Sequence, residues 1–317
     1  MNTFPQNNYQ TKSPVLFIIF SRPDTTAQVF AAIRIAQPKR LYIAADGPRI
    51  AKQGEDKKCA ETRDTVLAAI DWECEVKTLF RENNLGPKEA ISSAIDWFFD
   101  NETEGIILEH DCLPANSFFM FCDAMLEKYR YDTRIWLISG SNLTNKKWGD
   151  ASYYFSNLTN GWGWATWKRS WALYDKSLAQ YKAEDVRQQL EKIFDDPLIV
   201  DTWEHIFKDT KAGKIDTWDY QITFSHLFNH CVNIVSNNNL VSNIGFGELA
   251  ENTVNAESIF AAIPLETLTE INHPQYLLPE KEADRLTLWE EFDLEARYKR
   301  HNKLKNRFKR WIKGHKG

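Results

Sequence analysis

The 317-residue sequence lacks any apolar run of the about 20 residues that a membrane-spanning helix needs, and its N-terminus lacks a basic patch followed by an apolar stretch. Its five cysteines are an odd number and show no C-x-x-C spacing, which favours free thiols in a reducing compartment over a disulfide framework. We therefore expect a cytoplasmic chain that is neither secreted nor membrane-spanning. Internal repeats and low-complexity linkers are also missing.

Charge is distributed unevenly along the chain, and one segment is strongly basic. Residues 297–317 contain ten Lys or Arg and no acid, so the other 296 residues carry a net charge of −15, which argues against a general nucleic-acid binder. Within this basic tail, Leu304, Phe308, Trp311 and Ile312 recur at helical spacing. The pattern predicts an amphipathic helix lying peripherally on an anionic membrane surface, such as the inner face of the cell membrane. A basic helix docked on the acidic body is the alternative.

Apolar and aromatic residues are plentiful, at 43% and 13% of the chain, and they alternate between strand-like and helix-like patterns. Strands are expected at Val15 to Phe20, Arg40 to Ala45, Cys74 to Phe80, Gly105 to Leu108 and Ile135 to Ser139. Helices are expected up to about Ile35, from Cys59 to Trp72, from Pro87 to Phe99, and from a cap at Asn116 or Ser117 to Tyr129. This βαβαβαβαβ order predicts an α/β fold with a mostly parallel central sheet flanked by helices, which binds ligands at the carboxyl ends of its strands.

Acidic residues follow two of the expected strands. Glu109, His110 and Asp111 come directly after Gly-Ile-Ile-Leu, where a carboxylate could hold Mg²⁺ or Mn²⁺ against diphosphate oxygens. An acidic loop that caps the next helix is the competing interpretation. Asp46 ends the second strand and could accept hydrogen bonds from a ribose or a base, although aspartate before glycine is also an ordinary turn.

A segment rich in glycine and tryptophan runs from Gly161 to Trp171. Indole faces can lie on the apolar face of a pyranose, and we expect Trp162 and Trp164 to be the ligand contacts. Trp167 and Trp171 are four residues apart, which predicts the buried face of a helix.

A further acidic segment, Asp216-Thr-Trp-Asp219-Tyr-Gln, precedes an expected helix. An inverting group transfer needs a carboxylate near the acceptor hydroxyl to take its proton, and Asp219 is the candidate base. Because Asp216 and Asp219 both suit a helix start, an N-cap remains an equal alternative.

Taken in order, seven short motifs resemble one family. They are IIFSRPD, ADGP, RENNLGPKEAISSAIDWFF, GIILEHDCLP, NGWGWATWKRSW, WDYQ and NLVSNIGFGE. Together they resemble bacterial GT-A glycosyltransferases related to N-acetylglucosaminyltransferase I, over residues 14–253. The resemblance implies a GT-A type fold with a nucleotide-sugar-binding half at 14–143 and an aromatic-rich acceptor-side half at 144–253. An extension at 254–296 and the basic tail at 297–317 lie outside it.

The resemblance also implies roles for individual residues. Asp111 matches the last acid of the family's metal motif and would bind Mn²⁺ or Mg²⁺, and Asp219 matches the inverting base. The expected donor-binding set is Asp46 and Arg81 on the nucleotide side, Glu109 near the donor sugar, His110, and Arg22 in the loop after the first strand. His110 replaces the middle acid of the metal motif, and Ala250-Glu-Asn-Thr253 lacks a histidine that would contact the diphosphate.

The sequence therefore predicts an inverting, metal-dependent glycosyltransferase that moves a hexose, with N-acetylglucosamine favoured, from a UDP-sugar to a hydroxyl of a glycan or lipid-linked glycan. Two alternatives stay open. A sugar nucleotidyltransferase would carry a glycine-rich loop with a basic residue after its first strand, and Ser21 to Asp24 lacks those glycines. A non-catalytic carbohydrate-binding protein would use the tryptophans to hold sugar beside a degenerate metal site.

Overall fold

The computed structural model describes residues 9–247 and 258–302. Within them, eight strands form one sheet in the order β3-β2-β1-β4-β8-β6-β9-β7, and β5 and β10 form a separate pair. The strands of the large sheet are β1 (Val15–Ile19), β2 (Arg40–Ala45), β3 (Glu75–Phe80), β4 (Glu104–Glu109), β6 (Ile135–Ser139), β7 (Tyr153–Ser156), β8 (Trp164–Trp167) and β9 (Val232–Ser236). The small pair consists of β5 (Cys112–Pro114) and β10 (Val241–Asn243).

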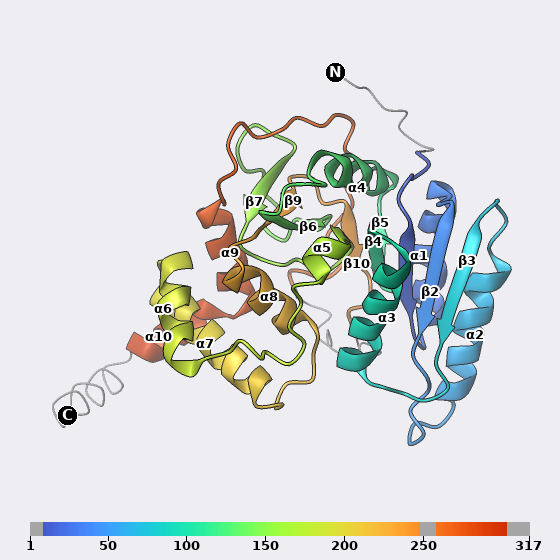
Figure 1. The fold of residues 1–317 in the computed structure, drawn as a ribbon, viewed down its shortest axis with the longest axis horizontal. Helices are drawn as coiled ribbons and strands as arrows, with labels where there is room; N and C mark the ends of the chain where they lie inside the picture. The colour runs from blue at the N-terminus through green and yellow to red at the C-terminus, as the bar shows by residue number, and fades with distance from the viewer. Residues whose placement is uncertain (1–8, 248–257, 303–317) are drawn as a thin grey trace.

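Helices flank this sheet (Figure 1). They are α1 (Pro23–Ala36), α2 (Glu55–Ala68), α3 (Pro87–Asn101), α4 (Asn116–Lys128), α5 (Lys168–Trp171), α6 (Ala183–Ile193), α7 (Pro197–Lys211), α8 (Asp219–Phe228), α9 (Lys281–Glu291) and α10 (Leu294–Asn302). The predicted α/β architecture, with a large central sheet between helices, is confirmed.

The direction of the strands determines which of them end at the same edge of the sheet. β1 pairs in parallel with β2 and with β4, and β2 pairs in parallel with β3. β8 is antiparallel to both β4 and β6, so β6 again runs the same way as β4. The carboxyl ends of β1, β2, β3 and β4 therefore lie at one edge, and the acids that follow β2 and β4 lie at that edge too.

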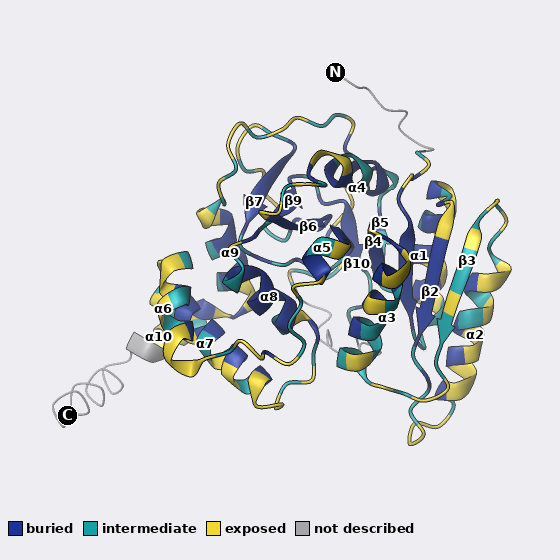
Figure 2. Cartoon of the chain, viewed as in Figure 1, coloured by how far each residue is buried: buried dark blue, intermediate teal, exposed yellow. Residues whose placement is uncertain are grey.

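The sheet is buried on both faces because each face carries its own core. In β1, Phe17 packs in a cluster with the α1 side chain Phe30, whereas Ile18 packs in a cluster with the α3 side chain Phe98. This alternation follows from the two-residue period of a strand. Figure 2 shows the central strands as buried, while the outward faces of the helices are exposed. A continuous apolar strand such as β1 is what a doubly covered parallel sheet requires.

Two local predictions were wrong. Helix α2 runs from Glu55 to Ala68, about a turn before the predicted range, because Gly54 has a φ of 78° and marks its start. Neither Asn116 nor Ser117 caps α4, whose N-cap is Ala115. The Asn116 amide instead pairs with the backbone of Tyr9, and the Ser117 hydroxyl accepts a hydrogen bond from the Leu268 amide.

The C-terminal helices pack against α7 and against each other. The Arg297 guanidinium donates to the Thr202 hydroxyl of α7 at 3.0 Å, and the Trp289 and Tyr298 rings lie 6.3 Å apart. The apolar positions of the predicted tail helix fall in 303–317, outside the described residues. None of the helices in the described part of the chain is long and apolar enough to cross a membrane.

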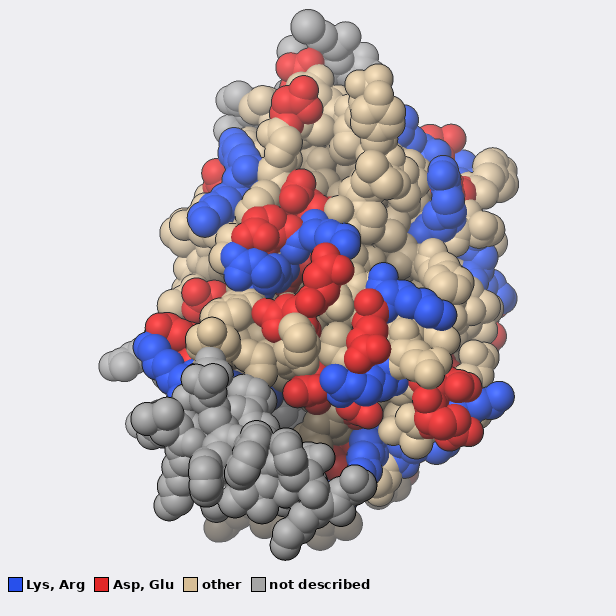
Figure 3. Space-filling model, turned by 90° about the vertical axis from the view of Figure 1, so that its left-hand side faces the viewer, with Lys and Arg blue, Asp and Glu red and all other residues tan. Residues whose placement is uncertain are grey.

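One side of the molecule, seen in Figure 3, mixes both signs of charge without a large patch of either. Several charged residues of helices α6, α7 and α9 form ion pairs. Arg187 of α6 pairs with Asp201 and Glu204 of α7, and Arg285 pairs with Glu282 within α9. Such a surface lacks the uniform basic stripe of a nucleic-acid binding face.

Candidate active site

Asp46 follows β2 and organises the loop after β3. Its carboxylate accepts hydrogen bonds from the backbone amides of Gly47 at 2.9 Å, Leu85 at 3.0 Å and Gly86 at 3.2 Å, and from the Asn84 side chain at 2.9 Å. Burial raises the pKa of Asp46, while these amides oppose the shift. Both carboxylate oxygens of Asp46 thus hold the loop after β3. The sequence did not predict this role, because Leu85 and Gly86 lie about 40 residues from Asp46 along the chain.

Gly47 shows how tightly this loop is packed. A Cβ on Gly47 would lie 2.4 Å from the backbone carbonyl carbon of Asn83. Arg81, the predicted uridine-side residue, lies beside Asp46 and donates from its guanidinium to the Ser93 hydroxyl at 2.8 Å. The structure therefore brings Asp46 and Arg81 together at the ends of β2 and β3.

Glu109, His110 and Asp111 lie at the end of β4, and each is half-buried. Burial, followed by the charges of Asp111 and Asp219, raises the pKa of Glu109. Asp219 lies more than a hundred residues further along the chain, so its influence on Glu109 places the two acids in one site. The predicted metal ligand and the predicted base are therefore neighbours of the same glutamate.

Asp111 is backed by the segment that follows β10. The backbone amide of Ile244 donates to the Asp111 carbonyl at 2.8 Å, and the next residue, Gly245, lies against the Asp111 side chain. Arg22, after β1, donates from its guanidinium to the Gly245 carbonyl at 3.1 Å. Arg22 therefore ties the end of β1 to the segment that supports Asp111, and its side chain is only 14% exposed.

Replacing Gly245 with alanine should displace Asp111. The added Cβ would lie 2.1 Å from the Asp111 carboxylate oxygen Oδ2, closer than any real contact, so either the carboxylate or the backbone must move. We expect Gly245→Ala to weaken Mn²⁺ binding at Asp111, measured by titrating Mn²⁺ into the protein in the presence of UDP.

Gly161→Ala is the matched control, because its Cβ would meet Trp218 at 3.7 Å, an ordinary contact distance. Unchanged Mn²⁺ affinity in Gly245→Ala would contradict the placement of the metal on Asp111.

Asp219 is the first residue of α8, and its side chain is exposed. The N-cap of α8 is Trp218, so neither Asp216 nor Asp219 is the capping residue. One Asp219 oxygen, Oδ1, accepts hydrogen bonds from the Thr217 hydroxyl and from the Tyr220 amide at 2.8 Å. The other oxygen, Oδ2, accepts none from the described residues. Surrounding protein atoms raise the pKa of Asp219, while the hydrogen bonds from Thr217 and Tyr220 oppose the shift.

A stack of aromatic rings fixes the start of α8 on the sheet. The Trp218 and Trp164 rings are stacked with centroids 5.9 Å apart, and the Trp171 and Tyr174 rings are stacked at 4.3 Å. The Tyr174 hydroxyl donates to the Trp218 carbonyl at 3.2 Å. Because Trp218 precedes Asp219, this stack sets the position of the candidate base.

The prediction that Trp164 contacts ligand is wrong. Trp164 is 1% exposed and lies in β8 between β4 and β6, so its indole belongs to the core. Trp167 and Trp171 are buried, as predicted, but they do not share a helix face, because Trp167 is the last residue of β8 and Trp171 the last of α5. Trp162 is half-buried, and its ring lies edge-on to Phe246, with centroids 5.7 Å apart. Trp162 lies before β8, which begins at Trp164, so the pairing of β8 with its neighbours buries Trp164 and leaves Trp162 half-buried.

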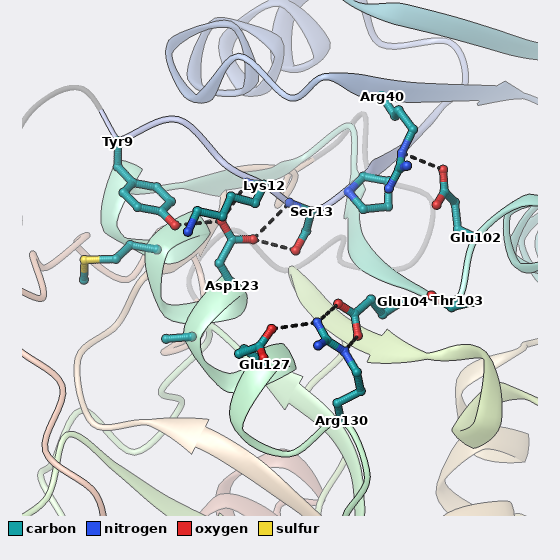
Figure 4. Close-up of a pocket in the computed structure, with 13 residues that line it drawn as sticks. Tyr9, Lys12, Ser13, Arg40, Glu102, Thr103, Glu104, Asp123, Glu127 and Arg130 are labelled. Carbon is teal, nitrogen blue, oxygen red and sulfur yellow. Dashed lines mark hydrogen bonds and ion pairs between the residues drawn. The ribbon is translucent and has the colours of Figure 1, made fainter.

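A separate cavity of about 510 Å³ lies at the opposite edge of the sheet, where β2 and β4 begin (Figure 4). Its acids are already paired. Asp123 accepts hydrogen bonds from Tyr9, Thr11, Lys12 and Ser13, and other ion pairs join Arg40 to Glu102 and Arg130 to Glu104. This network fastens the N-terminal segment to α4 and offers little free hydrogen-bonding capacity to a ligand.

The fold and site together define an α/β protein with carboxylates gathered at the ends of its parallel strands. No protein-family model and no curated protein sequence matches the chain. Among solved structures, mouse xyloside xylosyltransferase 1 in its apo form matches with a TM-score of 0.38 and 9% identity, over 83% of this chain and 98% of that one.

Two bacterial structures are also similar. The glycosyltransferase GlyE of Streptococcus pneumoniae TIGR4 has a TM-score of 0.33 and 12% identity, over 71% of this chain and 45% of that one. HddC from Yersinia pseudotuberculosis has a TM-score of 0.31 and 10% identity, over 50% of this chain and 77% of that one. At these TM-scores and identities, none of the three structures assigns a function to this chain.

Proposed function

We propose that the chain is a metal-dependent glycosyltransferase of GT-A type that transfers a hexose, with N-acetylglucosamine favoured, from a UDP-sugar to a hydroxyl of a glycan with inversion. The observation that carries the proposal is the electrostatic grouping of Glu109, Asp111 and Asp219 at the carboxyl edge of the sheet. These acids come from two distant parts of the chain. Asp111 would hold the metal ion and Asp219 would accept the proton of the acceptor hydroxyl.

Asp111 is the residue that would hold Mn²⁺ or Mg²⁺, because hard cations prefer carboxylate oxygens. Among the described residues, no three His, Cys, Asp or Glu side chains form a group that could hold a metal ion by themselves. The remaining ligands would therefore come from the donor diphosphate and water. When bound, such an ion neutralises the charge on the leaving diphosphate. The negative charges of Asp111 and Asp219 near Glu109 support this proposal, because they would attract a cation.

Asp219 would act on the acceptor. Its free Oδ2 oxygen takes the proton of the acceptor hydroxyl as the hydroxyl oxygen bonds to the anomeric carbon. The bond from that carbon to the diphosphate oxygen breaks, and the diphosphate leaves with the electron pair. Attack opposite the leaving group inverts the anomeric centre. The raised pKa of Asp219 makes its carboxylate a stronger base than an ordinary aspartate.

The donor side would be formed by the residues around the ends of β1 to β4. Arg81 and the loop held by Asp46 lie at the ends of β2 and β3, where nucleotides bind in folds of this kind. Arg22 links this region to Gly245 beside Asp111. Trp162, next to Phe246, is proposed to contact the acceptor sugar through its exposed indole surface.

A thermal-shift panel of UDP, GDP, CDP and dTDP, each with and without Mn²⁺, tests the proposal. Ligand at 100 times its Kd adds about 2.7 kcal/mol of stability, so we expect UDP with Mn²⁺ to raise the Tm by several degrees. Absence of a shift with every nucleotide would favour the non-catalytic carbohydrate-binding alternative. Release of pyrophosphate from UTP and a sugar phosphate would instead identify a nucleotidyltransferase.

A further inference from the structure

Three half-buried aromatic rings from distant parts of the chain meet near β10. Trp162 precedes β8, Phe246 follows β10, and Phe260 belongs to the C-terminal extension. The Trp162 ring lies edge-on to Phe246, with centroids 5.7 Å apart, and to Phe260, with centroids 6.5 Å apart. We call these three residues the ring cluster. All three are half-buried, so each keeps some apolar surface open.

Hydrogen bonds hold Phe260 in this position. Its backbone amide donates to the Ser258 hydroxyl at 3.3 Å, and the Ala261 amide donates to the Ser258 carbonyl at 2.9 Å. The Ala262 amide then donates to the Asn243 carbonyl of β10 at 3.0 Å. The turn that carries Phe260 is therefore docked on β10.

The segment that carries Phe246 lies against the carboxylate of Asp111. Gly245 directly precedes Phe246, and a Cβ added to Gly245 would lie 2.1 Å from the Asp111 oxygen Oδ2. This contact involves the carboxylate itself, so it places the backbone next to Phe246 at the proposed metal ligand. The Gly245 carbonyl also accepts a hydrogen bond from the Arg22 guanidinium at 3.1 Å, which holds the segment in place.

The segment that carries Trp162 lies against the start of α8. Gly161 directly precedes Trp162, and a Cβ added to Gly161 would lie 3.7 Å from the Trp218 ring. Trp218 is the N-cap of α8, whose first residue is Asp219. The segments of the ring cluster therefore contact both the carboxylate of Asp111 and the residue before Asp219.

The ring contacts leave aromatic faces uncovered. In a stacked pair each ring covers a face of its partner, whereas in an edge-on contact the ring that presents its edge keeps both faces clear of that partner. The interplanar angles of 89° and 69° within the ring cluster are of the edge-on kind. A surface of aromatic rings beside a few polar groups is typical of a small-molecule site, and here the carboxylate of Asp111 is such a group.

We propose that Phe246 and Phe260 bind the acceptor together with Trp162, and that the acceptor is a pyranoside held by the apolar face of its ring. The inference rests on the proposed glycosyl transfer and adds to it a substrate class. The ring cluster is assigned to the acceptor because its segments contact the start of α8, which carries the proposed base. A peptide hydroxyl or a polyprenyl phosphate offers no flat face of C–H bonds to these rings, so neither is expected to bind.

Phe260→Ala tests this surface on the full chain, with Ile259→Ala as the control. Ile259 is the adjacent residue, is 63% exposed and carries no ring. The probes are the methyl glycosides of glucose, galactose, mannose and N-acetylglucosamine, and a polyprenyl phosphate in detergent micelles, each titrated in the presence of UDP and Mn²⁺. We expect Phe260→Ala to weaken glycoside binding about tenfold, the effect of losing one aromatic contact, and Ile259→Ala to bind as the wild type does. The Tm increase caused by UDP with Mn²⁺ should stay unchanged in both variants.

Two further variants separate the ring from the fold. Phe260→Tyr keeps the ring and should bind glycosides as the wild type does. Phe260→Leu keeps an apolar side chain without a ring, and it should bind them about as weakly as Phe260→Ala, which keeps the test decisive if the alanine variant fails to fold. Glycoside affinity in Phe260→Leu equal to that of the wild type would overturn the inference. Loss of the UDP response in Phe260→Leu, with an unchanged Tm in the absence of ligand, would also overturn it, because the rings would then belong to the donor site.

The wild type alone separates the inference from the proposed function. If it responds to UDP with Mn²⁺ but binds the polyprenyl phosphate without the glycosides, or binds neither, the inference is overturned and the donor site stands. If it binds glycosides in a way that depends on Phe260 but does not respond to UDP with Mn²⁺, the result counts against glycosyl transfer and leaves the ring cluster as a sugar site.

Discussion

Asp219→Asn should lower kcat for sugar transfer by about 10²- to 10⁴-fold, the usual contribution of a positioned general base. The substitution keeps the size of the side chain but removes the oxygen that can accept a proton. Because Asp219 is proposed to act on the acceptor hydroxyl rather than on the nucleotide, we expect the KM for the UDP-sugar to change little. The measurement is steady-state transfer to a glycoside acceptor, with the release of UDP followed in parallel.

Asp216→Asn provides the control for this experiment. Asp216 lies three residues before Asp219 and is also exposed, but it is not among the charges that raise the pKa of Glu109. It should keep most of the wild-type rate. Equal rates for Asp219→Asn and the wild type would exclude Asp219 as the base, and a large drop in the Tm of Asp219→Asn would indicate a structural role.

The sequence predicts the nucleotide side of the fold well because its signals are local. The strand β1 is a continuous apolar run, and α3 buries Ala94, Ile95, Phe98 and Phe99, as their helical spacing indicates. Once the strands are predicted to be parallel, the acids that follow β2 and β4 are expected at the same edge of the sheet. Each of these inferences needs only a short window of sequence.

The features that were missed depend on contacts between distant segments. The pairing of β5 with β10 joins residues more than a hundred positions apart, and it brings Gly245 against Asp111. The contacts of the Trp203 ring with Tyr220 and with Phe292 likewise join segments that are far apart in the sequence. Trp164 was misassigned for a related reason. A tryptophan in a glycine-rich stretch suits a ligand loop, but the pairing of β8 between two other strands buries it.

The metal ligand can be tested apart from the base. Asp111→Ala should abolish the extra Tm increase that Mn²⁺ gives to UDP binding, because Asp111 is the protein ligand proposed for the ion and no group of three His, Cys, Asp or Glu side chains among the described residues could hold it instead. Asp100→Ala, at an exposed position near the end of α3, is the control and should behave as the wild type.

Asp111→Ala has a further consequence that a merely structural residue would not share. Removing the Asp111 charge takes away one of the two acids that raise the pKa of Glu109, so that pKa should fall toward the ordinary range for glutamate. It should also stay above that range, because burial is the larger cause. A lower Glu109 pKa, measured by NMR titration of the metal-free protein, together with loss of the Mn²⁺ effect, would place Asp111 and Glu109 in one site. Retention of the Mn²⁺ effect in Asp111→Ala would mean that the cation binds elsewhere, and transfer would then have to be explained without Asp111.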